Sequence, residues 1–193
     1  MTDPLAEWSR RHGDYDVARS RVVRWWLQLV ATLSAPLVRV PPDAISAAGV
    51  ATAVAAIVAP RRAAAGLVLA TGVLDGVDGA VARRRDVASR HGAFVDTAAD
   101  RLTDVLFLLA LRRRGARRPL VFVAAAGVAA LELQRALARR RGDPVAVVTP
   151  GERPFRVAYA ALGLAFAPSL GAAAIGGTTV AGGLALYRER RQR

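Results

Sequence analysis

The chain has 193 residues, 53% of them hydrophobic, and it contains no cysteine. This length suits a single domain, and the apolar composition with its long hydrophobic runs is typical of a membrane protein and unlike a soluble one. The absence of cysteine excludes a disulfide framework and a thiolate metal site.

The formal net charge is +13, and all 28 basic residues are arginines. A strongly basic chain can bind nucleic acid or an anionic membrane surface. Here the arginines flank apolar segments and do not form a soluble basic face with aromatic platforms, as nucleic-acid binders have. The charge therefore indicates contact with membrane lipid, and no nucleic-acid partner is expected.

Residues 1–43 are predicted to form a cytoplasmic segment and an interfacial helix. Residues 1–24 are polar, rich in arginine, and lack the pattern of a cleavable signal. The apolar run 25–38 that follows is short for a span, and its paired Trp25 and Trp26 suit the headgroup boundary. We expect an amphipathic helix lying in the interface, with a true span as the alternative.

An all-α integral membrane domain is expected over residues 44–187, followed by a basic tail at 188–193. Prolines and the acidic Asp43 mark the start of its first helix. No alternation typical of strands is evident, and the small residues suit close helix packing, as at Gly176-Gly177 and Gly182-Gly183. About six transmembrane helices are predicted, at 44–59, 63–82, 93–111, 119–138, 155–169 and 171–187.

With the amino terminus in the cytoplasm, this topology places nineteen arginines on the cytoplasmic side and seven in the outer turns. The distribution follows the tendency of positive charge to stay inside. Residues 112–118 oppose it locally, because five arginines fall in one outer turn. On this topology the acidic residues described next open toward the cytoplasm.

Four aspartates form two pairs with helical spacing, Asp75 with Asp78 and Asp96 with Asp100. Residues three or four apart share one helix face, so each pair points together from its own helix. An aspartate at membrane depth costs roughly 2.5 to 3.5 kcal/mol, and four such charges repel one another. A divalent cation removes both problems, and carboxylate oxygens suit Mg²⁺ or Mn²⁺. The pattern therefore predicts a metal site.

A phosphate-bearing substrate is also expected, because Mg²⁺ in proteins is commonly shared with substrate phosphates. Arg83 lies one turn after Gly79 and is placed to bind that phosphate. Gly79 and Ala82 leave room for a ligand close to the backbone.

The string Asp75-x-x-Asp78-Gly79-x-x-Ala82-Arg83, eight residues, then Gly92-x-x-x-Asp96-x-x-x-Asp100 resembles the signature of the CDP-alcohol phosphotransferase family at every defined position. The resemblance implies that a CDP-linked lipid, such as CDP-diacylglycerol, transfers its phosphatidyl group to an acceptor alcohol and releases CMP. It also implies two Mg²⁺ or Mn²⁺ ions bound by the four aspartates, Asp100 as the base, a homodimer, and a place in the bacterial cytoplasmic membrane.

The resemblance suggests further binding residues for the CDP moiety. Gly79 and Arg83 would surround its nucleotide end, and Ser89 would touch the diphosphate, although Ser89 could equally cap the helix that follows. Asp43 falls in a stretch similar to the family's Pro-Asn-x-Ile-Thr element near the cytidine, although helix capping explains it as well.

The acceptor site resembles the phosphatidylinositol phosphate synthase-like branch, which has a Glu-Arg-x-x-Arg stretch where this chain has Glu152, Arg153 and Arg156. Two arginines three apart can hold a phosphate, or they can simply reach the membrane boundary. Arg135 is a third candidate, with Glu132 as its simple partner. A phosphorylated polyol such as glycerol 3-phosphate or inositol phosphate is the expected acceptor. A membrane divalent-cation carrier, or a catalytically inactive scaffold, is the alternative function.

Overall fold

The structure is a computed structural model that describes residues 21–85, 89–142 and 151–191. These residues form seven helices and no strand, as the sequence predicted. The first 20 residues of the predicted amino-terminal segment and the last two of the basic tail lie outside the described residues. The helices are α2 Arg21–Ser34, α3 Pro42–Val58, α4 Arg61–Arg84, α5 Arg90–Arg113, α6 Arg118–Arg141, α7 Arg153–Ala165 and α8 Pro168–Arg191.

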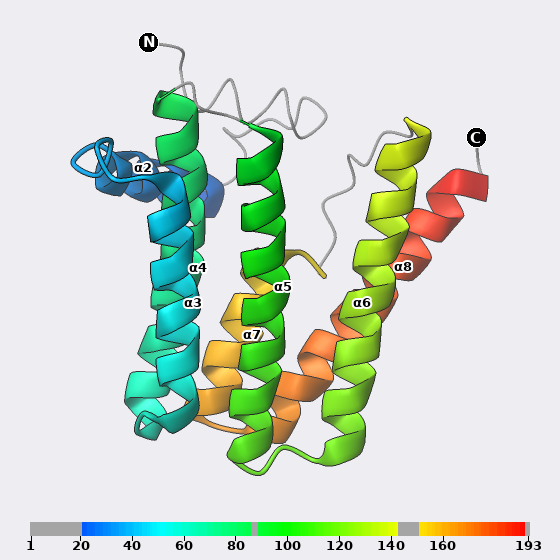
Figure 1. Ribbon diagram of the computed structural model, residues 1–193. Coiled ribbons are helices and arrows are strands. Elements are labelled where there is room, and N and C mark those ends of the chain that lie inside the picture. The colour runs from blue at the N-terminus through cyan, green and yellow to red at the C-terminus, as the bar shows by residue number, and fades with distance from the viewer. Residues whose placement is uncertain (1–20, 86–88, 143–150, 192–193) are drawn as a thin grey trace.

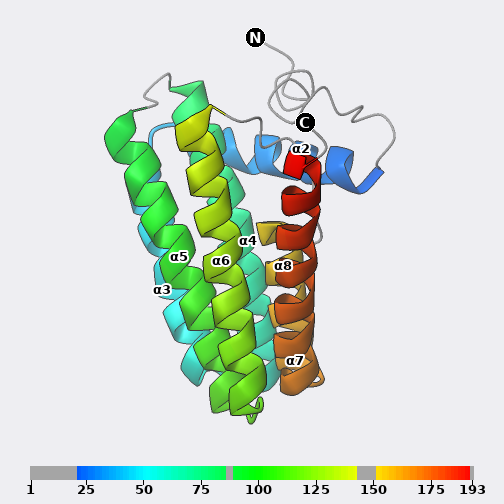
Figure 2. The same ribbon diagram turned by 90° about the vertical axis from the view of Figure 1, so that its right-hand side faces the viewer.

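Helices α3 to α8 form a bundle, and α2 lies across one end of it (Figures 1 and 2). Helix α4 packs against α3 and α7, while α6 packs chiefly against α8. The short α7 contacts both α4 and α8 and so connects the two halves of the bundle. The arrangement brings α4, α5 and α7 together, and these helices carry most of the candidate site residues.

The helix starts follow from proline chemistry. Pro42, Pro119 and Pro154 each occupy one of the first two positions of α3, α6 and α7, where a missing N–H costs nothing because that group has no partner within the helix. Helix α6 ends at Gly142, whose φ of 75° lies in the left-handed region that glycine adopts without strain. Local sequence therefore sets these boundaries.

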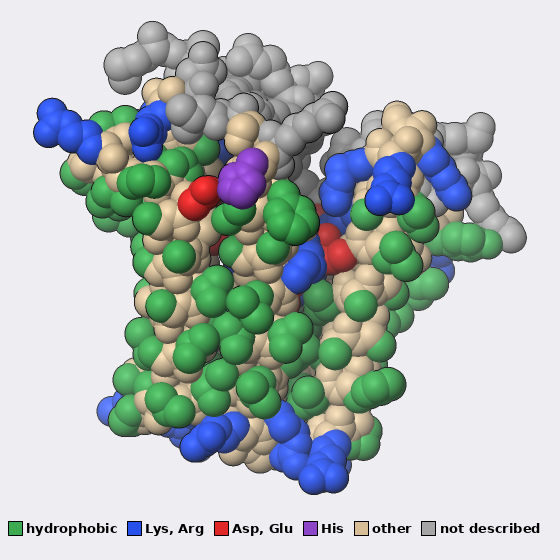
Figure 3. Space-filling view, in the orientation of Figure 1, with side chains coloured by type: hydrophobic (Ala, Val, Ile, Leu, Met, Phe, Trp, Pro, Cys, Tyr) green, Lys and Arg blue, Asp and Glu red, His purple; other side chains and the backbone are tan. Residues whose placement is uncertain are grey.

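Each of the six predicted apolar segments forms a helix, α3 to α8. Three helices of the described residues are long and apolar enough to cross a membrane, namely Arg61–Arg84, Arg118–Arg141 and Pro168–Arg188. Pro42–Val58 is apolar but shorter. On the face of the bundle that Figure 3 shows, apolar side chains lie between basic groups at its two ends, which suits a membrane protein.

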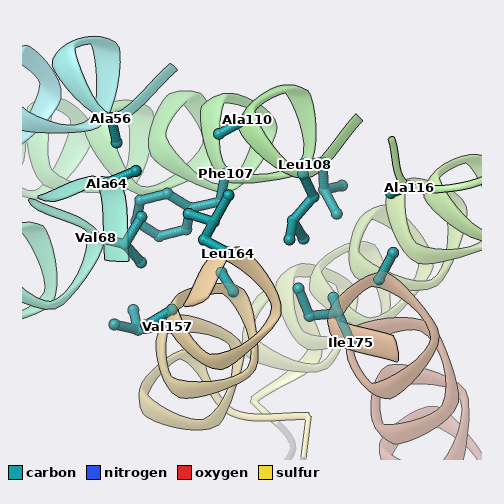
Figure 4. Packing of buried hydrophobic residues seen from close by; sticks show 14 of the residues in the cluster. Ala56, Ala64, Val68, Phe107, Leu108, Ala110, Ala116, Val157, Leu164 and Ile175 are labelled. Atoms are coloured by element: carbon teal, nitrogen blue, oxygen red, sulfur yellow. The ribbon is translucent and has the colours of Figure 1, made fainter. Parts of the chain in front are cut away.

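One cluster of buried apolar residues connects all six helices from α3 to α8. Phe107 of α5 belongs to it with Val68 of α4 and Leu164 of α7 (Figure 4). A second cluster joins α2 to the bundle, where Val30 packs with Val77 and Val81 of α4. The two clusters fix α4 relative to its neighbours, and α4 is the helix that carries the first pair of motif aspartates.

Close backbone approach at the turn between α7 and α8 depends on glycine. A Cβ added at Gly163 would lie 2.8 Å from the Cα of Gly171 and 2.8 Å from the Cδ2 of Leu111. Gly163→Ala is therefore expected to lower the free energy of unfolding by about 1 to 3 kcal/mol, because the backbone must shift. Gly66→Ala is the control, since no atom lies within 4 Å of the added Cβ. Equal stability of the two variants in detergent unfolding would contradict this packing.

Candidate functional site

Three of the four motif aspartates come together between α4 and α5. Asp75 lies on α4, and Asp96 and Asp100 lie one turn apart on α5. One carboxylate oxygen from each of the three lies within 4.8 Å of the others. The helical spacing in the sequence thus becomes a single group of carboxylate oxygens, in the half of the bundle nearer to α2.

Asp78, the fourth motif aspartate, is 4% exposed and is held by its neighbours. The Ser46 hydroxyl donates to Asp78 Oδ2 at 2.5 Å, and the Gly79 amide donates to Oδ1 at 2.6 Å. Asp78 and Asp75 line the same pocket among α3, α4, α5 and α7. The residues that line it are Ser46, Gly49, Thr71, Asp75, Asp78, Ala99, Thr103 and Arg153.

The residues present fit a divalent cation. The donors are carboxylates only, the ligand type that Mg²⁺ and Mn²⁺ prefer. Asp100 Oδ1 is buried and accepts no hydrogen bond from the described residues; it only lies 3.1 Å from Arg153 Nη2 as an ion pair. A buried carboxylate oxygen that lacks a hydrogen bond is costly, and a metal ion would satisfy it.

Arg153, the first residue of α7, reaches into this acidic cluster. Its Nε donates to Asp75 Oδ2 at 3.0 Å, and its Nη1 donates to the backbone carbonyl of Asp100 at 3.0 Å. Its Nη2 donates to Thr103 Oγ1 at 3.0 Å. One guanidinium thus connects α4, α5 and α7 and offsets part of the cluster's negative charge.

Glu132 of α6, whose side chain is 13% exposed, binds three further arginines. Arg156 donates to Glu132 Oε1 at 3.0 Å, and Arg135 donates to the same oxygen at 3.3 Å. Arg101 lies 3.0 Å from Oε2. The expected pair of Glu132 with Arg135 is therefore confirmed, although Glu132 is shared. Arg156, from the predicted acceptor stretch, is only 2% exposed.

Asp104 completes this network and was not singled out by the sequence analysis. It is 5% exposed and lies 3.3 Å from Arg156 Nη2 and 3.2 Å from Arg101 Nη1. Its spacing of four residues after Asp100 continues the same helix face, and that signal could have identified it. At the outer edge of the network Arg135 also pairs with Glu152.

Gly79 and Arg83 lie together on α4, as their spacing predicted. A Cβ added at Gly79 would lie 3.1 Å from Arg83 Nη1, so the arginine side chain folds over the glycine. Arg83 is exposed and lies one turn beyond the pocket. A ligand phosphate beside Gly79 would be within reach of this guanidinium.

The remaining candidates for the CDP moiety lie at the amino-terminal ends of α3 and α5. Ser89 caps α5, because the Gly92 amide donates to its Oγ at 3.0 Å; the expected capping role is confirmed. Asp43 is exposed and lies 3.8 Å from Nε2 of the exposed His91. In the sequence His91 has no second nitrogen or sulfur ligand nearby, and its side chain is 77% exposed in the structure.

The chain is similar to known proteins over most of its length. The family model for CDP-alcohol phosphatidyltransferase matches residues 39–186, which include every motif aspartate. No curated protein matches the chain. Two crystal structures of Mycobacterium tuberculosis phosphatidylinositol phosphate synthase, PgsA1, have a similar fold, each with 24% sequence identity and a TM-score of 0.64.

The PgsA1 structure with CDP-DAG bound covers 83% of this chain and 92% of its own. The structure in complex with manganese and citrate covers 82% of this chain and 87% of its own. These likenesses concern the fold, while the family assignment rests on the match over most of the chain. The chain therefore belongs to the CDP-alcohol phosphatidyltransferase family and is a transferase of this class.

Proposed function

We propose that this protein transfers the phosphatidyl group of CDP-diacylglycerol to a phosphorylated polyol, in a metal-dependent reaction of phospholipid synthesis that releases CMP. The observation that carries the proposal is the meeting of Asp75, Asp96 and Asp100, with carboxylate oxygens within 4.8 Å, in a chain of this family. PgsA1 binds CDP-DAG in one structure and manganese in the other, which supports both the lipid substrate and the metal.

Asp75, Asp78, Asp96 and Asp100 would hold two Mg²⁺ or Mn²⁺ ions. When bound, such ions neutralise the charge of a diphosphate and of the departing phosphate. The pocket beside Asp75 and Asp78 is bounded by small residues such as Gly49 and Ala99. Gly79, Arg83, Ser89 and Asp43 would bind the CDP moiety.

In the proposed reaction the acceptor hydroxyl attacks the lipid-bearing phosphorus. The new P–O bond forms as the bond from that phosphorus to the CMP oxygen breaks, and CMP leaves with the electron pair. Asp100 takes the hydroxyl proton, as the last acid of the motif and a carboxylate with one oxygen that accepts no hydrogen bond from the described residues.

A phosphate on the acceptor is proposed because arginines concentrate beside the acidic cluster. Arg153 forms an ion pair with Asp100 of the cluster, and Arg156 and Arg135 both donate hydrogen bonds to Glu132. Guanidinium groups bind phosphate through paired hydrogen bonds. Glycerol 3-phosphate and inositol phosphate both carry the required hydroxyl and phosphate.

The membrane arrangement is part of the proposal. Helices α3 to α8 would span the bacterial cytoplasmic membrane with the site toward the cytoplasm, and α2 would lie in the interface. The placement of α2 across the end of the bundle, with Trp25 62% exposed, supports this role. A homodimer is proposed from the family resemblance.

The test is CMP release by purified protein given CDP-diacylglycerol, Mg²⁺ or Mn²⁺, and one acceptor at a time. We expect release with one phosphorylated polyol, little with the same polyol lacking phosphate, and none in excess EDTA. Readdition of Mn²⁺ after EDTA should restore it. Release that persists in EDTA, or that is indifferent to the acceptor phosphate, would contradict the proposal.

A divalent-cation carrier or inactive scaffold is the competing function. Both a carrier and a scaffold predict Mn²⁺ binding without CMP release with any acceptor. A carrier also predicts Mn²⁺ uptake into proteoliposomes. The same purified protein serves for both measurements, so one preparation distinguishes the two functions.

A further inference from the structure

The end of the bundle opposite the acidic cluster is strongly basic (Figure 3). Seven arginines lie at the turns from α3 to α4 and from α5 to α6, and we call them the basic end. No aspartate or glutamate occurs in residues 44–74, 105–131 or 153–188, which contain this end. The members of the basic end are Arg61, Arg62, Arg112, Arg113, Arg114, Arg117 and Arg118.

Three of these arginines have a structural role. Arg61 Nη2 donates to the Phe166 carbonyl at 3.0 Å, where α7 ends. Arg114 Nη1 donates to the Ile57 carbonyl at 3.4 Å, near the end of α3. Arg112 donates within the turn that follows α5. The last carbonyls of a helix lack partners within it, so Arg61 caps α7 and Arg114 caps α3. Carbonyl groups carry no formal charge, and the positive charge remains uncompensated.

The other four arginines are exposed, namely Arg62, Arg113, Arg117 and Arg118. Their guanidinium groups make no hydrogen bond or ion pair with any of the described residues. Their mutual repulsion, in a region without a carboxylate, calls for anions from outside the chain.

Large apolar side chains lie beside these charges. Val58, Phe122, Phe166 and Leu170 are 72%, 76%, 76% and 71% exposed. Phe122 follows Arg118 by one helical turn on α6, so the two share a face. An anionic phospholipid has a headgroup that can meet the arginines and acyl chains that can lie along these apolar side chains.

We propose that the basic end binds anionic phospholipid headgroups, with their acyl chains along the neighbouring apolar side chains. A phosphodiester accepts the guanidinium hydrogen bonds, and a net negative headgroup also supplies the missing counter-charge. A second copy of this chain would bring the same positive charge to the contact and is disfavoured. The inference depends on the membrane setting but not on the transferase reaction.

The test measures which lipid lies next to the basic end. Trp8, Trp25 and Trp26 are changed to Phe, and Phe122→Trp then supplies the only tryptophan, which is excited selectively as the fluorescent reporter. The protein is reconstituted with acyl-brominated phosphatidylglycerol or acyl-brominated phosphatidylcholine, each diluted into unlabelled phosphatidylcholine. We expect quenching to report about a fivefold or greater local enrichment of the anionic lipid at low salt, and less at high salt.

Removal of the charge should remove the preference. In the reporter background, Arg113→Gln, Arg117→Gln and Arg118→Gln together are expected to bring the enrichment close to onefold. The corresponding triple lysine variant should keep most of it, because charge is retained. Quenching by brominated phosphatidylcholine, unchanged in both, reports that the Trp at position 122 still faces lipid in a folded bundle.

The matched control removes the same charge at the other end of α6. Arg139→Gln, Arg140→Gln and Arg141→Gln together should leave the enrichment at position 122 unchanged. Equal quenching by the two brominated lipids in the parent reporter would overturn the proposal. So would an enrichment that survives the first triple variant or disappears only in the control.

Discussion

Asp100→Asn is expected to lower CMP release by about 10³-fold or more while the protein still folds. Asp100 supplies a carboxylate to the three-acid cluster, and in the proposed reaction it also takes the proton of the acceptor hydroxyl. The amide keeps the size of the side chain but neither accepts that proton nor offers an anionic metal ligand. Initial rates at saturating CDP-diacylglycerol and acceptor, with Mn²⁺ affinity measured by electron paramagnetic resonance, provide the check.

Thr97→Val is the matched control on the same helix. Thr97 is exposed, and its hydroxyl donates only to the Ala93 carbonyl one turn earlier, so CMP release should change little. An Asp100→Asn protein that retains activity within about tenfold of the parent would exclude Asp100 as the base. If neither the parent nor the Asp100→Asn protein releases CMP, but both bind Mn²⁺ equally, the carrier or scaffold function is favoured.

Glu132→Gln is expected to lower the free energy of unfolding by about 3 to 5 kcal/mol. The side chain is 13% exposed and accepts charge-assisted bonds from Arg156, Arg135 and Arg101. Removal of its charge leaves the buried guanidinium groups of Arg156 and Arg135 with too little negative charge. Unfolding of the purified protein by SDS in mixed micelles, followed by circular dichroism, measures the change.

Glu152→Gln is the control for this second prediction. Glu152 pairs with Arg135 as well, but its side chain is 31% exposed, and water can replace the lost partner. A loss of about 1 kcal/mol or less is expected. Equal losses of unfolding free energy in the two variants would mean that the buried arginine partners of Glu132 add nothing to stability.

The motif acids show how much of the site local sequence could predict. Asp96 and Asp100 are one turn apart, so helical periodicity alone places them on one face. Asp75 and Asp78 follow the same logic on α4, and the structure brings Asp75 to the α5 pair. Asp78 instead accepts from Ser46, which is 32 residues earlier in the chain, and no local pattern indicated that bond.

The partners of Arg153 and Glu132 on other helices could not be predicted from helical spacing. Arg153 binds Asp75 across 78 residues of sequence, and Arg156 binds Glu132 across 24. The sequence could assign these residues to helices and to a phosphate-binding hypothesis. It could not pair them, because spacing fixes direction only within one helix.

The sequence by itself determined the helices, their proline-marked starts, the apolar segments and the face on which each pair of acids lies, because all of these depend on residues within one or two turns. Tertiary structure alone decided that Asp104 joins a buried ionic network and that Arg61 and Arg114 cap other helices. The physical reason is that a buried charge or an unpaired carbonyl takes whichever partner the packing of distant helices brings within hydrogen-bond distance.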